Sequence, residues 1–191
     1  MKLTRAGIKD RAAWEKAGIT LPGYDVEAVS EKAKKEPVWV HFGIGNIFRV
    51  FIGGIADGLL EEGVMDRGIT CVETFDYDVV DKIYQPYDNL GLNVILHGNG
   101  TREYKVIGSL AEAVKAQASD PEQWKRLKEI FASSSLQLVS FTITEKGYAL
   151  HRADGTWLPY VAADIQNGPE KATGAMAVLV AMLYVRYQVG K

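Results

Sequence analysis

The sequence predicts an α/β fold built on a doubly wound, parallel sheet. Short apolar, β-prone runs at 38–42, 69–73 and 136–143 alternate with segments of helical spacing, a pattern typical of strands buried in a parallel sheet. Two glycines, Gly43 and Gly45, follow the first run, and an apolar helical pattern follows them. The chain of 191 residues, 47% apolar and 24% charged, is long enough for one sizeable globular domain.

Residues 1–37 are polar and mixed, and we expect them to form a lead-in segment that packs on the domain. A turn signal, Leu21-Pro22-Gly23-Tyr24-Asp25, comes before a short helix predicted over 26–35. Pro37 is expected to end that helix, because the residue before a proline is driven away from helical backbone angles.

The stretch Val38–Arg49 has the order strand, glycine turn, helix. In an α/β protein, backbone N–H groups and the helix dipole at such a turn can hold the pyrophosphate of a dinucleotide. We expect Gly43 to allow the tight turn and Gly45 to let a phosphate approach the backbone. Phe48 stands where the third glycine of G-x-G-x-x-G is usual, so the turn taken alone also fits an ordinary strand-to-helix connection.

A long helix is predicted over 47–62 from apolar residues at helical spacing, namely Val50, Phe51, Ile55, Leu59 and Leu60. Gly53 and Gly54 weaken this prediction, since a glycine within a helix costs roughly 1 kcal/mol against alanine. Close packing of the helix on the sheet is one reason to keep glycine there. Gly63 is expected to form the C-cap.

The second predicted strand, 69–73, ends in Glu73, and Asp76 follows in the loop. An acid at this place can hydrogen-bond the adenosine ribose hydroxyls, and its charge repels a 2′-phosphate, which favours NAD over NADP. The alternative for each acid is a solvated loop carboxylate. Cys71, the single cysteine, excludes an intramolecular disulfide and is expected to be a buried, inert thiol.

The middle of the chain predicts a helix, a β-hairpin with an Asn-Gly turn, and two further helices. Ser109 is expected to cap the first of these two helices, and Pro121 to open the second. The predicted ranges are 77–84 for the first helix, 93–97 and 104–107 for the hairpin, and 110–117 and 122–132 for the later helices.

The third predicted strand, 136–143, runs into Thr144, Glu145 and Lys146. Ligands of open α/β sheets lie outside the carboxyl ends of the strands, so we expect these residues at the mouth of the same cleft as the glycine turn. The alternative is a surface ion pair on a turn. Short strands are expected over 148–151 and 156–158.

A last helix is predicted from about 167 to 187, and its part from Met176 to Val185 is apolar on nearly every side. Such a helix needs cover all round, and we expect a part of the natural protein beyond Lys191 to supply it. The same apolar run is too short to cross a bilayer, and the N-terminus has no apolar signal-peptide core, so a cytoplasmic protein is expected.

Nucleic-acid and metal sites are not expected. The net charge of −2 supplies no basic surface field for nucleic acid. The three histidines, His41, His97 and His151, lie far apart in the sequence and match no metal motif. We expect them to be structural or surface residues.

Several short motifs, in order along nearly the whole chain, resemble those of the polyol-specific long-chain dehydrogenase/reductase family, which includes mannitol 2-dehydrogenase, fructuronate reductase and tagaturonate reductase. Residues 42–49, Phe-Gly-Ile-Gly-Asn-Ile-Phe-Arg, resemble its G-x-G-x-F-H-R signature, with Arg49 in agreement. Residues 142–148, Thr-Ile-Thr-Glu-Lys-Gly-Tyr, are similar to its T-x-T-E-x-G-Y segment. Residues 21–25 and 164–174 look like its lead-in and the approach to its interdomain helix. The chain departs from the family at Ile47, Phe48 and Phe51, where phenylalanine, histidine and often a second histidine stand.

The resemblance implies a Rossmann-like doubly wound sheet with an inserted β-hairpin and a C-terminal apolar helix. It implies an NAD-dependent oxidoreductase that transfers hydride between NAD(H) and a linear sugar alcohol or sugar acid, of the mannitol/fructose or mannonate/fructuronate type. The implied division is a lead-in over 1–37, an NAD-binding domain over 38–168, and the start of an interdomain helix over 169–191.

The resemblance also assigns the site. Glu145 is expected on the substrate side, and no metal is required. The family's catalytic lysine, in a K-x-x-x-x-N-x-x-H motif on a helical C-terminal domain, has no counterpart in this chain, so we expect no catalytic residue here and no turnover by the chain alone. The expected cofactor-binding residues are Gly43, Ile44, Gly45, Asn46, Ile47, Arg49, Glu73, Asp76 and Thr144.

Two other functions stay open at this point. A methyltransferase that uses S-adenosylmethionine also has a glycine turn after its first strand and an acid after its second. Phe42 argues against it, because an acid is common before the turn in that class. A non-catalytic nucleotide-binding module is the other alternative.

Overall fold

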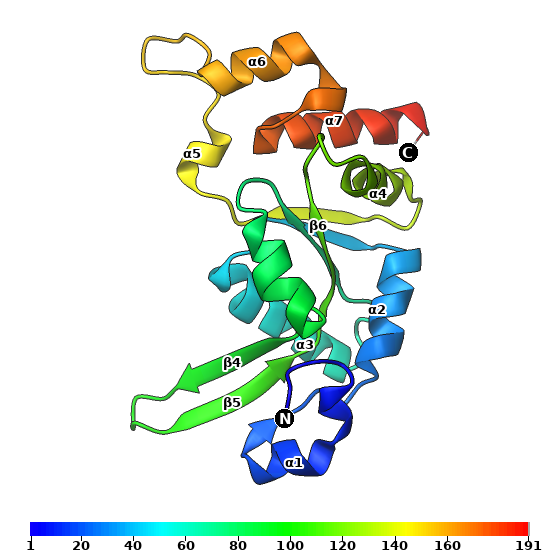
Figure 1. The fold of residues 1–191 in the computed structure, drawn as a ribbon, viewed down its shortest axis with the longest axis vertical. Helices are drawn as coiled ribbons and strands as arrows, with labels where there is room; N and C mark the ends of the chain where they lie inside the picture. Colours follow the sequence, from blue (N-terminus) through cyan, green and yellow to red (C-terminus); the bar gives the residue numbers. More distant parts are fainter. Residues whose placement is uncertain (191) are drawn as a thin grey trace.

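The computed structural model describes residues 1–190 and centres on a four-stranded sheet, all parallel, with the strand order β6-β3-β2-β7 (Figure 1). Numbered along the chain within this sheet, the order is third, second, first, fourth, which is that of a Rossmann sheet. The predicted fold class is therefore confirmed. The strands are β2 (Trp39–Phe42), β3 (Ile69–Glu73), β6 (Leu110–Lys115) and β7 (Leu138–Phe141).

Helices cover both faces of this sheet. The connection from β2 to β3 carries the π-helical turn η2 (Phe48–Ile52) and α3 (Gly53–Glu61), and its side chains share a core with the inner residues of β3 and β6. The connection from β6 to β7 carries α4 (Pro121–Ala132), which packs on the opposite face together with α7 (Ala175–Gln188). The winding direction therefore reverses between β2 and β7, and the carboxyl ends of these strands form the topological switch point where such folds bind ligands.

The predicted hairpin is confirmed, and it lies outside the parallel sheet. Strands β4 (Gly91–Leu96) and β5 (Arg102–Ile107) are antiparallel, and β1 (Ile19–Thr20) from the lead-in adds to β5 in parallel. This second sheet and α1 (Arg11–Lys16) form the lower end of the molecule in Figure 1, away from α6 and α7.

The lead-in also packs through apolar side chains and through one buried carboxylate. Trp14 and Leu21 share a small core with Val106 of β5. The side chain of Asp57, in α3, is fully buried: it accepts a hydrogen bond of 2.5 Å from the Tyr24 hydroxyl and pairs with Lys105 Nζ at 2.8 Å. Because a buried charge is stable only when it is paired, this contact ties the lead-in, α3 and the hairpin together.

Two predicted helices form, and each begins at a capping aspartate. In α2 (Val26–Lys35), Asp25 accepts from the Ala28 amide, and in α4, Asp120 accepts from the first amides of the helix. The other helical elements are η1 (Gly7–Lys9), the π-helical turn η3 (Val80–Tyr84), η4 (Gln85–Tyr87), α5 (Glu145–Tyr148), α6 (Pro159–Asn167) and η5 (Pro169–Lys171). None of the helices within residues 1–190 is long and apolar enough to cross a bilayer.

The helix predicted over 110–117 is wrong, because this segment is strand β6. Its backbone pairs with β3, with Leu110 beside Ile69 and Val114 beside Val72. The local helix propensity is overridden by pairing with a buried strand. Ser109 caps nothing there: its hydroxyl donates to the Gly53 carbonyl at 2.7 Å.

The C-terminal quarter also differs from the prediction. Residue 148 ends the short helix α5, and of the expected strand pair only the bridge between His151 and Trp157 forms. The last helix begins at Ala175, after α6 and η5, rather than at 167. Gly168, at φ +77°, ends α6 with a backbone conformation that side chains rarely allow.

Three apolar residues of the predicted helix and strands are largely exposed, and one of them is Ile55, at 52%. Phe51 is 65% exposed, because η2 and α3 turn it away from the sheet. Leu138 is 47% exposed, because β7 is an edge strand of the four-stranded sheet.

Candidate functional site

The glycine turn follows β2 directly, at the switch point beside β7. Gly43 has φ +86°, and a Cβ there would lie 2.4 Å from the Thr142 carbonyl oxygen, so the turn requires glycine. A Cβ at Gly45 would meet no atom within 4 Å. Gly43 therefore serves close packing of the backbone, whereas Gly45 borders open space.

Two side-chain hydroxyl groups donate hydrogen bonds to the carbonyl groups of this turn. The Thr142 hydroxyl donates to the Gly43 carbonyl at 2.7 Å, and the buried Tyr84 hydroxyl donates to the Ile44 carbonyl at 2.8 Å. Because each carbonyl is held inward, the turn cannot rotate freely, and its orientation is set by β7 and by η3.

The backbone N–H groups of Gly45, Asn46 and Ile47 indicate a binding role for the turn. Asn46 and Ile47 begin the helical stretch, and with Gly45 they are exposed. Within residues 1–190, the amides of these three residues donate no hydrogen bond. The first N–H groups of a helix have no partner inside it, and together with the helix dipole they favour an anion.

Glu73 is buried at the end of β3, beside the glycine turn, and is 8% exposed. Its Oε1 accepts from the amides of Thr74 at 2.9 Å and Phe75 at 3.0 Å, and its Oε2 lies 3.5 Å from the Ile44 amide. The carboxylate thus joins the loops after β2 and β3. Asp76 is exposed on the same loop.

The remaining predicted site residues, Arg49, Thr144 and Glu145, follow the turn or follow β7. Arg49 donates to Asn46 Oδ1 at 2.6 Å, and its guanidinium carbon lies 6.0 Å from the Tyr84 ring centroid, which places a cation beside the turn. Thr144 and Glu145 are exposed just after β7, the strand next to β2.

His41 is buried in β2 beneath the turn, as a structural residue. Burial lowers the pKa of its imidazole to about 4, so the ring is neutral at pH 7. Burial likewise raises the pKa of the Cys71 thiol well above its usual value, which leaves an unreactive thiol. Within residues 1–190, no group of three or more His, Cys, Asp or Glu side chains could hold a metal ion.

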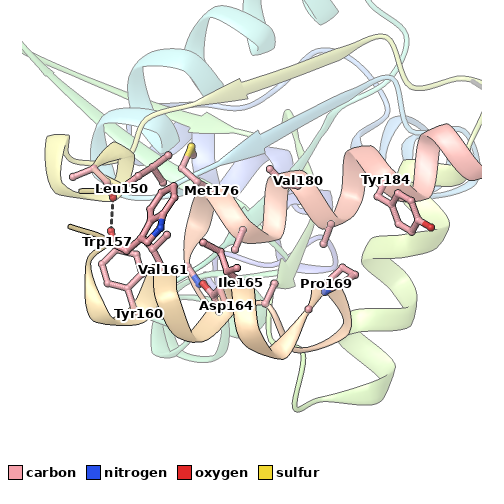
Figure 2. Close-up of a pocket in the computed structure, with 17 residues that line it drawn as sticks. Leu150, Trp157, Tyr160, Val161, Asp164, Ile165, Pro169, Met176, Val180 and Tyr184 are labelled. Carbon is pink, nitrogen blue, oxygen red and sulfur yellow. Dashed lines mark hydrogen bonds between the residues drawn. The ribbon is translucent and has the colours of Figure 1, made fainter. Parts of the chain in front are cut away.

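An open apolar groove of about 640 Å³ lies between α6 and α7, away from the glycine turn (Figure 2). Trp157 and Val161 line one side, and Met176 and Val180 line the α7 side. Asp164, at its floor, accepts from the Thr173 and Gly174 amides and so fixes the start of α7. The groove shares no lining residue with the turn.

The structure brings most of the predicted site together: the glycine turn, Glu73 and the segment after β7 meet at one edge of the sheet. Sequence reasoning missed the roles of Tyr84 and Thr142. The position of Thr142 at the end of a strand was a usable signal, but nothing local marked Tyr84.

Comparisons with known proteins identify relatives of this chain. No family model matches the chain. Over 191 residues the chain is 48% identical to D-mannonate oxidoreductase from Thermotoga maritima, spanning 100% of this chain and 35% of that protein. It is 28% identical over 181 residues to polyol:NADP oxidoreductase from Gluconobacter oxydans, spanning 91% of this chain and 35% of that protein.

Two solved structures share the fold. D-sorbitol dehydrogenase in substrate-free form matches with a TM-score of 0.74 and 28% identity, over 91% of this chain and 35% of that one. Pseudomonas fluorescens mannitol 2-dehydrogenase, solved as a ternary complex with NAD and D-mannitol, matches in fold with a TM-score of 0.78 and 24% identity, over 100% of this chain and 37% of that one.

The chain therefore spans about 35% of the length of the curated relatives that it matches. The resemblance found in the motifs is confirmed: over its whole length this chain is similar in sequence to the N-terminal 35% of D-mannonate oxidoreductase, and it shares the Rossmann-like fold of the matching parts of D-sorbitol dehydrogenase and mannitol 2-dehydrogenase.

Proposed function

We propose that this chain is the NAD-binding part of an oxidoreductase that acts on a linear sugar alcohol or sugar acid. One observation carries the proposal: the amides of Gly45, Asn46 and Ile47 have no partner within residues 1–190, and they start a helix at the switch point of a Rossmann sheet. The similarity to named oxidoreductases along the whole chain supports it.

The residues present fit a dinucleotide. The three amides would bind the pyrophosphate, the missing Cβ of Gly45 leaves room for it, and Arg49 adds positive charge beside it. Bound NAD would supply the hydride acceptor. Thr144 and Glu145, after β7, would face the nicotinamide and substrate side, with no metal ligand required.

Glu73 and Asp76 would bind the adenosine ribose. A buried carboxylate at the end of β3 repels a 2′-phosphate, so we expect NADH to bind more tightly than NADPH. One relative is named as an NADP oxidoreductase, which makes this preference a point to measure.

The substrate proposal favours a sugar acid of the mannonate/fructuronate type, because the relative at 48% identity is named D-mannonate oxidoreductase. We propose residues 38–168 as the cofactor domain, 1–37 as its lead-in, and 169–191 as the start of an interdomain helix. A catalytic lysine is expected from protein outside this chain, so the chain alone should bind cofactor without turnover. A cytoplasmic location belongs to the same proposal.

The test is a titration of the folded chain with NADH, NADPH and S-adenosylmethionine, followed by calorimetry. We expect NADH to bind and NADPH to bind at least about tenfold more weakly, which is about 1.4 kcal/mol. In the matched variant Glu73→Gln, the amide oxygen can still accept from the Thr74 and Phe75 amides but the charge is gone, so the preference should shrink. Binding of S-adenosylmethionine without NADH would instead support a methyltransferase, and binding of none of the three would overturn the proposal.

A further inference from the structure

A continuous chain of five polar groups runs beneath the glycine turn, from β2 across to β7 and back. Trp39 Nε1 donates to Ser140 Oγ at 2.7 Å, and Ser140 Oγ lies 2.8 Å from His41 Nδ1. His41 Nε2 lies 2.8 Å from Thr142 Oγ1, which donates to the Gly43 carbonyl at 2.7 Å. The residues come from neighbouring positions of paired strands, since His41 is in register with Ser140.

The two ends of this chain fix the direction of every hydrogen bond in it. An indole N–H can only donate and a carbonyl can only accept. The single hydroxyl hydrogen of Thr142 therefore goes to Gly43, and His41 Nε2–H must donate to Thr142. In a neutral ring Nδ1 then accepts, and it accepts from the Ser140 hydroxyl.

The imidazole ring is also held in place by packing. His41 is fully buried, and its ring stacks on Phe48 with centroids 4.0 Å apart and 12° between the planes. Phe48 is itself fully buried in the first turn after the unpartnered amides. The ring therefore links β2, the strand before the turn, to the helix after it.

We propose that His41, acting through Thr142, is a positioning residue for cofactor binding: the neutral Nε2–H tautomer holds the Gly43 carbonyl inward, so that the amides of Gly45, Asn46 and Ile47 face the pyrophosphate. His41 does not touch the ligand in this scheme. The inference rests on the proposed function and adds to it a group that sets the geometry of the phosphate-binding turn.

A pair of substitutions at Thr142 separates this role from bulk packing. Thr142→Val keeps the shape of the side chain and removes the hydroxyl, whereas Thr142→Ser keeps the hydroxyl and removes a methyl group. We expect Thr142→Val to raise the Kd for NADH about tenfold, because the Gly43 carbonyl and the His41 Nε2–H both lose their partner. Thr142→Ser should stay within about twofold of the unaltered chain.

The ligand probes test whether the loss arises at the pyrophosphate. ADP-ribose contains the pyrophosphate and adenosine does not. In NMR titrations of the ¹⁵N-labelled chain, Thr142→Val should therefore weaken the binding of ADP-ribose and leave the binding of adenosine unchanged. An equal loss with both probes, or a Thr142→Val affinity equal to that of the unaltered chain, would overturn the inference.

The tautomer supplies a readout that does not need the cofactor. ¹⁵N NMR of His41 should show a protonated Nε2 and an unprotonated Nδ1 at pH 7. The backbone order parameters of residues 45–47, measured by ¹⁵N relaxation, should fall in Thr142→Val but not in Thr142→Ser. If the unaltered chain fails to bind NADH, the proposed function fails, and the inference is judged on this readout alone. An Nδ1–H tautomer, or order parameters at residues 45–47 that do not change in Thr142→Val, would refute it.

Discussion

Buried polar side chains, rather than apolar contacts, orient the backbone around the glycine turn. Glu73 joins two loops through their amides, and Tyr84 and Thr142 each hold one carbonyl. Leaving such a group unpaired costs about 1–3 kcal/mol, more than the net gain of forming one ordinary hydrogen bond. The turn is therefore sensitive to single-atom changes at Tyr84 and Thr142, which contact no ligand in the proposed site.

The buried histidine predicts a loss of stability in mild acid. The pKa of His41 is lowered to about 4 by burial, so between pH 6.5 and about 4 the unfolded chain binds more protons than the folded one. The free energy of unfolding should fall across this window, by on the order of 2 kcal/mol when solvent screening is allowed for. Urea unfolding across this range would measure it, and His41→Gln should be less stable at pH 7 but show a flatter profile. Parallel profiles would contradict the prediction.

Two glycines of helix α3, Gly53 and Gly58, have different surroundings. A Cβ at Gly53 would lie 3.2 Å from Leu110 Cδ2 and 3.4 Å from Ile107 Cγ2, so this glycine lets the helix approach β5 and β6 closely. A Cβ at Gly58 would meet nothing within 4 Å. The close approach expected from the sequence is thus found at Gly53.

These two glycines give a matched prediction. Gly58→Ala should stabilise the chain by about 0.5–1 kcal/mol, because alanine costs less backbone entropy in a helix and meets no neighbour. Gly53→Ala should lose that gain or reverse it, because two buried side chains must move. Equilibrium urea unfolding of both variants measures the difference, and equal stabilisation by both would show that the packing at Gly53 is not tight.

At the scale of the whole molecule, helix α7 presents an exposed apolar face formed by Val180, Leu183, Tyr184 and Tyr187. Helix α7 buries Val178 and Met182 against α4, but Val180 is 64% exposed and Tyr187 is 78% exposed. Contiguous exposed apolar surface of this kind marks a site of contact with other protein.

We therefore expect the chain alone to self-associate through α7 as its concentration rises. Val180→Glu should reduce this association, because it places a charge in the middle of the apolar surface. Leu96→Glu is the control, since Leu96 is 71% exposed on the hairpin, at the other end of the molecule. Sedimentation equilibrium distinguishes the outcomes, and equal masses for both variants at every concentration would show that α7 is not the contact surface.

The sequence alone determined the elements whose signals are local. The first two strands, the hairpin, α2 and α4 carry their own periodicity, turn residues or caps, and all five formed within a few residues of the predicted bounds. The glycine turn and Glu73 were found for the same reason, because each follows a strand that is apolar enough to be recognised.

Only the tertiary structure decided what depends on partners far away in the chain. Segment 110–117 has the composition of a helix, but it forms strand β6 because its backbone pairs with β3. Tyr84 and Thr142 donate hydrogen bonds to carbonyl groups of the turn because folding places η3 and β7 beside β2. Propensities and caps are properties of neighbouring residues, whereas strand pairing and buried hydrogen bonds are chosen by the whole fold, which must satisfy every backbone group that it removes from water.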